Sequence, residues 1–476
     1  MNPDDVVLAL DQGSQSSRAV LFDAAGRELA VASVPVGTRR EGADRVEQAP
    51  DELVASLELA ARDACDAAGP RRVAAAGLAT QRSTIVCWDR TTARPLSAAI
   101  SWQDRRNAGW LARLAAHEAE VRRRTGLPLS PHYGASKLRW CLEHLDEVQA
   151  AASEGRLAAG PLSSFLARRI VDGGPCVVDP ANAARTLLFD PDALDWAPDL
   201  LALFGIPRNV LPECVPTSHR YGSLAVDGRS VPLMACTGDQ SAAAFAFGRP
   251  RDDVALVNIG TGAFVQRVAP HSAPAPDGLL RSVLSSGAAG ALRSHEGTVN
   301  GAASALEWLR GRVAIDVDRA VPQLAGRPLD CGAPAFVNGV GGLGAPWWLP
   351  GFPTCFDGDA DDDVARVAAV VESIAFLLAT NLAALAAASP LGRVVVSGGL
   401  ARSDYLCRVL ASTSGLPVER HVLAEATARG AAFLAAGSPA TWAPVPVERR
   451  FEPEASAALA ARRALWRAAM ARRGAA

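Results

Sequence analysis

The amino-acid sequence predicts an α/β protein with two lobes of similar topology. Short β-rich runs alternate with helical stretches, as in proteins whose helices pack on a sheet. A strand, a turn of small residues and a second strand near the start return in the second half of the chain, which indicates an internal repeat. The 476 residues are 49% hydrophobic, enough for two lobes of ordinary size.

The alternation is clearest at the start of the chain. Three β-rich runs at 6–10, 19–23 and 28–34 precede a helical stretch at 51–67 and a buried strand at 73–78. This order predicts a small antiparallel meander followed by a helix and a further strand.

The repeat places similar turns in the two halves, one around Gly13 and the other at Gly260-Thr261-Gly262. Each lobe would present its turn to a shared cleft. We expect an N-terminal lobe at 1–248, a C-terminal lobe at 249–437, and a tail at 438–476 whose helix packs on the second lobe.

Charge and cysteine content narrow the class of function. The formal net charge is −2, from 48 basic and 50 acidic side chains, so we expect a small neutral ligand and neither nucleic acid nor a membrane as partner. The nine cysteines show no CxxC pair, which indicates buried thiols and a cytoplasmic protein. The apolar stretch 364–388 contains Arg366 and Glu372, so we expect a buried helix there.

Polar residues gather at three turns that suit a nucleotide. The first holds an acid, a glycine, hydroxyls and an arginine, and glycine turns let backbone amides approach phosphate oxygens. The second is the glycine turn of the repeat, and the third follows a buried strand at Ser397-Gly398-Gly399. Each turn alone could be an ordinary polar hairpin. Together they resemble the phosphate and adenosine motifs of the actin-like ATPase superfamily.

Asp239 is the candidate general base. It follows an apolar strand in Gly238-Asp239-Gln240, where aspartate also commonly caps a helix. A carboxylate facing the cleft could accept a proton from a substrate hydroxyl that attacks the γ-phosphate.

Two other patterns are rejected. The G-x-G-x-x-G string at 339–344 runs into Ala-Pro-Trp-Trp, which cannot open the helix of a dinucleotide fold. A Walker loop is absent, because the single lysine, Lys137, has no glycine-rich loop before it.

Several strings, in the same order along the chain, are similar to motifs of the FGGY carbohydrate kinases, and to the glycerol kinases in particular. They are Asp11 to Arg18, Thr80-Gln81-Arg82, Trp102 to Arg106, Gly238-Asp239-Gln240, Gly260-Thr261-Gly262, Gly342 to Trp348 and Ser397-Gly398-Gly399. The resemblance implies two ribonuclease H-like lobes that close over ATP, Mg²⁺ and a polyol or sugar. The first lobe would bind substrate and phosphate, and the second would bind nucleotide.

The resemblance also implies roles for single residues. Asp239 would be the catalytic base and Asp11 would bind Mg²⁺. The substrate would contact Arg82, Ser83, Trp102, His132, Tyr133, Asp239, Gln240 and Phe264. ATP would contact Gly13, Ser14, Gln15, Arg18, Gly260, Thr261, Gly398, Gly399 and Ser403.

Two positions depart from the glycerol kinase pattern. Ser83 stands where those kinases have glutamate, and His132 stands at their pocket tyrosine, beside Tyr133. One lost polar contact is worth roughly 1–3 kcal/mol, enough to change the preferred substrate. Glycerol, a ketose and a longer alditol therefore stay open as substrates, as does homo-oligomerisation. An ATP-binding sensor and an ATPase that moves protein partners are the alternatives of another class.

Overall fold

The computed structural model describes residues 4–269, 274–312, 316–359, 362–387 and 389–475. The chain forms two compact units. The first unit consists of Met1–Arg249, Ser282–Arg293 and Glu425–Pro444, and the second of Pro250–Arg281, Ser294–Ala424 and Val445–Ala476. The lobe boundaries at 248 and 437 stay a prediction.

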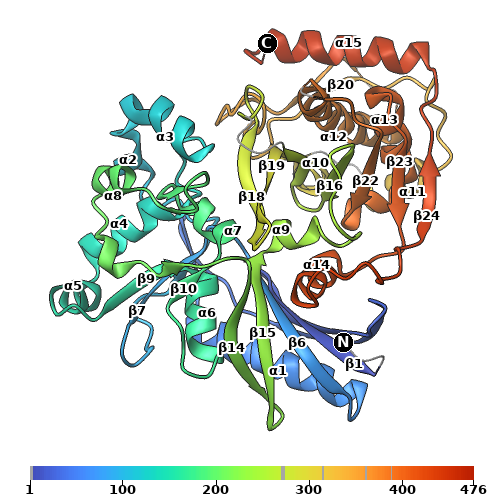
Figure 1. Cartoon of the computed structure of the whole chain (residues 1–476). Coiled ribbons are helices and arrows are strands. Elements are labelled where there is room, and N and C mark those ends of the chain that lie inside the picture. The colour runs from blue at the N-terminus through green and yellow to red at the C-terminus, as the bar shows by residue number, and fades with distance from the viewer. Residues whose placement is uncertain (1–3, 270–273, 313–315, 360–361, 388, 476) are drawn as a thin grey trace. The chain divides into compact units, whose positions relative to one another are not determined.

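The first unit is built on a six-stranded mixed sheet, in which β1, β6 and β15 are parallel and the outer strands pair antiparallel (Figure 1). β1 is buried at every position, as expected of a central parallel strand. The order of the strands is β14 (Ser218–Val226), β15 (Arg229–Gly238), β6 (Arg72–Thr80), β1 (Asp5–Gln12), β2 (Ser16–Phe22) and β3 (Glu28–Pro35).

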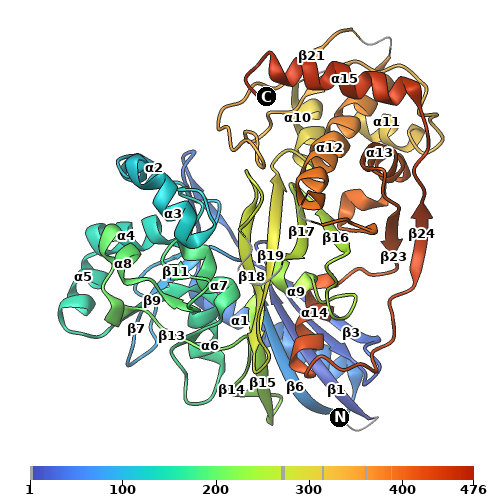
Figure 2. The same cartoon turned by 45° about the horizontal axis from the view of Figure 1, so that its top comes forward.

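Helices cover both faces of this sheet. Leu8 belongs to the core that packs under α1 (Pro50–Ala68), which begins with Pro50 and two acidic residues and ends at Gly69. The next residue of β1, Ala9, points to the other face and pairs with Gly77. There α14 (Ala426–Ala435) contacts β1 and β6, and a side chain on Gly77 would collide with the backbone of Ala431 (Figures 1 and 2).

A smaller five-stranded sheet completes the first unit, in the order β4 (Arg39–Glu41), β5 (Arg45–Gln48), β8 (Ala99–Ile100), β7 (Ile85–Asp89) and β9 (Leu157–Pro161). Helix α4 (Gly134–His144) contacts β7 and β9. The candidate substrate pocket is therefore built on packed elements of the first unit. Its two parts are the turn between β6 and β7 and the start of α4.

The second unit repeats the strand order of the first. β16 (Val254–Ile259) pairs antiparallel with β17 (Ala263–Ala269) and parallel with β22 (Arg393–Ser397), which is followed by the parallel β23 (Val418–His421). β1, β2, β6 and β15 have the same arrangement in the first unit. The prediction of an α/β protein with two lobes of like topology is confirmed.

The remaining strands of this sheet lie at its edges. β18 (Leu280–Gly287) and β19 (Gly290–Val299) precede β17 in the order, although their residues Ser282–Arg293 are assigned to the first unit. β24 (Val447–Phe451) follows β23 at the other edge. The sequence did not predict β24, which directly follows the Pro-rich segment 439–446. The G-x-G-x-x-G string at 339–344 forms a loop after β20 (Ala335–Val337).

Helix α12 (Asp363–Ala386) forms much of the core of the second unit. Asp362 caps it by accepting a hydrogen bond of 2.6 Å from the Ala365 amide. Within the described residues it is the one helix long and apolar enough to cross a membrane, yet 83% of its apolar window is buried inside the protein. The buried core helix of a protein can be as long and as apolar as a membrane span, and α12 is such a helix, as the sequence predicted. The last residue of the predicted stretch, Ala388, lies outside the described residues.

Candidate active site

The first turn joins β1 to β2 and carries the residues predicted to hold phosphate. The Gly13 amide donates to the Ser16 carbonyl oxygen at 3.0 Å, which closes the turn. A Cβ atom on Gly13 would lie 3.2 Å from that oxygen, so glycine lets the two strands join tightly. Ser14 and Gln15 follow at the tip, and Arg18 is on β2 opposite Asp11.

Two other carboxylates act electrostatically on Asp11, at the end of β1. Burial and, to a smaller degree, the charge of Asp239 raise the pKa of Asp11 to about 7, against a partial opposing effect of Arg18. Glu425 also raises it, and this carboxylate lies 3.7 Å from the Arg18 guanidinium. A divalent cation would relieve this repulsion, so the residues present fit Mg²⁺.

Among the residues that the structure describes, no three His, Cys, Asp or Glu side chains gather as a metal site. A cation held by Asp11 would therefore need phosphate oxygens and water as its other ligands, which is usual for Mg²⁺.

Asp239 is the first residue of α9 (Asp239–Ala243), and the preceding Gly238, not Asp239, occupies the N-cap position. Its carboxylate lies 3.6 Å from Arg82 Nε and accepts a hydrogen bond of 2.7 Å from the Gln240 amide. Arg82 is buried whereas the Asp239 side chain is 29% exposed. The arginine holds the carboxylate in a position from which it can still reach a ligand.

Glycine at position 238 makes this pair possible. A Cβ atom there would lie 2.5 Å from Arg82 Cγ and Cδ. Because β6 and β15 are parallel neighbours and Thr80 pairs with Gly238, their ends bring Arg82 and Asp239 together.

Trp102 and Ser14 are joined by a hydrogen bond. The indole Nε1 donates to Ser14 Oγ at 2.9 Å, and Ser14 Oγ donates to Gln81 Oε1 at 3.2 Å. The predicted phosphate and substrate groups are therefore contiguous within the first unit.

Gln81 is a buried centre of this network. Its Nε2 donates to Gln12 at 3.1 Å and to Gln48 at 2.7 Å, and Thr84 Oγ1 donates to its Oε1 at 3.2 Å. The sequence placed Gln81 in a motif but gave it no role.

The two departures from the glycerol kinase pattern lie close together. Lys137 Nζ donates both to the Ser83 carbonyl at 2.9 Å and to the His132 carbonyl at 2.7 Å. The His132 ring lies 5.6 Å from the Trp102 ring and 5.0 Å from the Tyr133 ring. Burial and the charge of Lys137 lower the pKa of His132, so its imidazole is neutral at pH 7.

The second unit carries the other predicted nucleotide residues. Twelve of the eighteen residues predicted to bind ATP, substrate or metal belong to the first unit. The second unit holds the other six, with Phe264 on β17 and the nucleotide turns at Gly260 and Gly398. In the β16–β17 turn, the Thr261 carbonyl accepts hydrogen bonds of 3.0 Å from the amide and the hydroxyl of Ser304. The Thr261 side chain is exposed.

The third turn follows β22. Gly398 has a φ of +91°, and a Cβ atom there would lie 2.6 Å from the Ile259 carbonyl oxygen. Gly399 is exposed with open space around it. Ser403 caps α13 (Asp404–Ser414), its Oγ accepting from the Leu406 amide at 3.3 Å. Gly399 thus leaves open backbone, and Ser403 has a structural role besides any contact with ligand.

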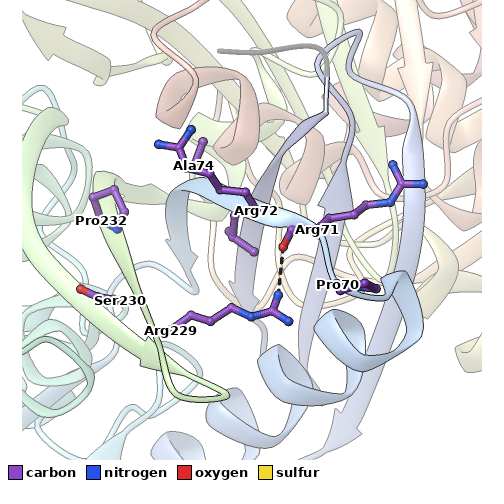
Figure 3. Close-up of a pocket in the computed structure, with 8 residues that line it drawn as sticks. Pro70, Arg71, Arg72, Ala74, Arg229, Ser230 and Pro232 are labelled. Atoms are coloured by element: carbon purple, nitrogen blue, oxygen red, sulfur yellow. Dashed lines mark hydrogen bonds between the residues drawn. The ribbon is translucent and has the colours of Figure 1, made fainter.

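A hollow of about 440 Å³ in the first unit holds none of these residues (Figure 3). It lies at the start of β6 and β15, where Arg229 donates to the Arg71 carbonyl at 2.9 Å. The candidate site lies at the other end of the same strands, roughly 25–30 Å away at the rise of a β-strand.

Comparison with known proteins identifies the class. Residues 6–246 match the N-terminal domain, and residues 255–438 the C-terminal domain, of the FGGY family of carbohydrate kinases. The chain belongs to this family, and the prediction of an ATP-dependent carbohydrate kinase is confirmed.

Among similar proteins, the chain is 36% identical to the glycerol kinase of Geobacter sp. (strain M21) over 473 residues, 94% of each chain. It is 36% identical to the glycerol kinase of Koribacter versatilis over 488 residues, 98% of each chain. These matches cover nearly the whole length of both proteins.

Solved structures agree with the fold. A Plasmodium falciparum glycerol kinase with ADP superimposes with a TM-score of 0.89 at 22% identity, covering 99% of this chain and 98% of that one. A ligand-bound xylulose kinase from Lactobacillus acidophilus gives 0.85 at 17% identity over 98% of both chains. The fold is shared by kinases with different substrates.

Proposed function

We propose that this kinase transfers the γ-phosphoryl group of ATP to a hydroxyl of glycerol or a slightly longer polyol in the cytoplasm, with Asp239 as general base. The observation that carries the proposal is the Arg82–Asp239 pair, 3.6 Å apart beside Asp11. The guanidinium can bind substrate oxygens while it holds the adjacent carboxylate, which would act as the base.

The substrate would lie between the polar pair and the indole. Trp102 would cover the carbon chain, Arg82 would bind hydroxyl oxygens, and Asp239 would accept the proton of the attacking hydroxyl. Asp11 would hold Mg²⁺, which when bound neutralises charge on the phosphates. The exposed Thr261 and the turn at Ser14 would contact phosphate, and the open backbone at Gly399 would face adenine.

The identity of the polyol depends on Ser83. Its Oγ is buried and makes no hydrogen bond with any described residue. Serine is shorter than glutamate and uncharged, so it leaves room for a further hydroxymethyl group. The opposing possibility is that water fills this room and glycerol remains the substrate. The similarity of nearly the whole chain to glycerol kinases favours glycerol as the substrate. The unpaired Ser83 hydroxyl favours a longer polyol.

The test is ADP release with glycerol, erythritol, ribitol and xylulose, each for wild type and for Ser83→Glu. If the longer-polyol proposal holds, a four- or five-carbon polyol has the highest wild-type kcat/KM, and Ser83→Glu shifts the preference toward glycerol. Glycerol preferred by a wide margin in both proteins would establish the glycerol alternative. No ADP release with any polyol or sugar would refute the proposed function itself.

A further inference from the structure

Lys137 is the single lysine of the chain, and it is buried with 1% of its surface exposed. A buried lysine normally pairs with a carboxylate. Within the described part of the chain, no carboxylate lies within 4.0 Å of Lys137 Nζ, and the ammonium donates instead to two backbone carbonyls. An ammonium with only carbonyl partners serves to hold backbone in place.

The two carbonyls come from separate segments of the candidate pocket. Ser83 lies in the turn between β6 and β7, and His132 precedes α4. Their distances to Nζ are 2.9 and 2.7 Å, both within hydrogen-bond range. One side chain therefore fixes the separation of the two segments.

The backbone of Ser83 needs such support. Its φ is +64°, in the left-handed region that residues other than glycine seldom adopt. Its Oγ is buried and has no hydrogen-bond partner among the described residues. Lys137 therefore holds in place a buried hydroxyl whose hydrogen-bonding capacity the described residues leave unused.

We infer that Lys137 is a positioning residue for polyol recognition, which sets the size of polyol that the first unit accepts by fixing Ser83 relative to His132. The inference rests on the proposed function. Lys137 acts through these two residues, and Arg82 and Asp239 remain the groups proposed to touch the reacting hydroxyl.

Kinetics of Lys137→Met test the inference, with Arg139→Met as the matched control. Arg139 lies on the same helix, but its guanidinium contacts Glu143 and the Phe204 carbonyl and so leaves the pocket untouched. Loss of both hydrogen bonds predicts a polyol KM that rises by about tenfold or more. The KM for ATP should stay within about twofold, and Arg139→Met should match wild type.

Ser83→Gly in the Lys137→Met background tests the backbone role. Glycine adopts positive φ without strain, so Lys137→Met should raise the polyol KM less in the Ser83→Gly background than in the wild-type background. A merely structural lysine would not be rescued by this change, because the lost packing around α4 would remain.

The single lysine also gives a readout that is independent of turnover. Selective ¹³C-lysine labelling yields one side-chain signal, which should shift when glycerol or erythritol is added without nucleotide. This measurement needs no variant and applies even if Lys137→Met fails to fold.

The outcomes separate the inference from the proposed function. ADP release with polyols, combined with an unmoved lysine signal and an unchanged polyol KM in Lys137→Met, would overturn the role of Lys137 and leave the kinase activity intact. Equal rises in KM for ATP and polyol would also overturn it. If the chain phosphorylates no polyol, the proposed function fails first.

Discussion

At the scale of single residues, some residues of the candidate site could be predicted from short sequence motifs, and others could be found only from the structure. Asp11, Arg82 and Asp239 come from short strings of polar residues at strand ends, so sequence patterns found them. Glu425 and Lys137 lie outside such strings, and a lone lysine on an amphipathic helix has no pattern of its own. Their contribution follows only from the fold, which brings them to residues far away in sequence.

The buried Lys137 predicts a pH dependence of stability. Burial lowers its pKa from 10.5 to about 7, Arg106 acts in the same direction, and Asp104 partly opposes both. Between pH 7 and pH 10 the unfolded chain thus binds a proton at Lys137 that the folded chain does not. This contribution to the free energy of unfolding rises with pH, by at most about 1.4 kcal/mol per pH unit.

Denaturant unfolding of wild type and Lys137→Met over this pH range measures the effect. Cysteine and tyrosine residues titrate in both proteins, so only the difference between the two curves reports Lys137. We expect the free energy of unfolding of wild type to rise relative to that of the variant as the pH rises. A difference that is flat with pH would show that Lys137 keeps its ordinary pKa.

At the scale of elements, the strands and helices near the motifs could be predicted, and the long-range partners could not. The apolar runs that form β1, β6 and β16 are continuous, so their length and pattern were sufficient to predict strands. β24 could not be predicted, because proline precedes it and four of its five residues are exposed. Its position depends on pairing with β23, which local sequence does not encode.

The C-terminal helix α15 (Ala457–Ala471) is held on the second unit by a buried ion pair. Arg462 donates to Glu372 of α12 at 2.9 Å and 2.8 Å, and Tyr405 of α13 donates to the same carboxylate at 2.6 Å. Arg462→Met would leave Glu372 buried without its cation, so we expect a loss of about 3–5 kcal/mol in unfolding free energy.

Urea unfolding of wild type, Arg462→Met and a double variant tests whether the Arg462–Glu372 ion pair anchors α15. The double variant Glu372→Leu/Arg462→Met removes both charges and should be more stable than Arg462→Met alone. If Arg462→Met unfolds like wild type, the ion pair does not anchor α15.

At the scale of the whole molecule, two units of like topology each supply part of the predicted site. The first unit holds the turn at Gly13 and Asp239, and the second holds the turns at Gly260 and Gly398. Transfer of a phosphoryl group requires exclusion of water, so we expect substrates to draw the units together. Small-angle scattering should show a smaller radius of gyration with a nonhydrolysable ATP analogue plus polyol than without ligand. Identical profiles in the two conditions would count against closure.

The central claim is that Asp239 takes the proton of a polyol hydroxyl during transfer from ATP, and ADP release by Asp239→Asn tests it most directly. Asparagine keeps the size of the side chain and removes the base. The account predicts a loss of about 10²–10⁴ in kcat with nucleotide binding retained. A variant that folds, binds ATP and turns over its polyol within a few-fold of wild type would contradict it.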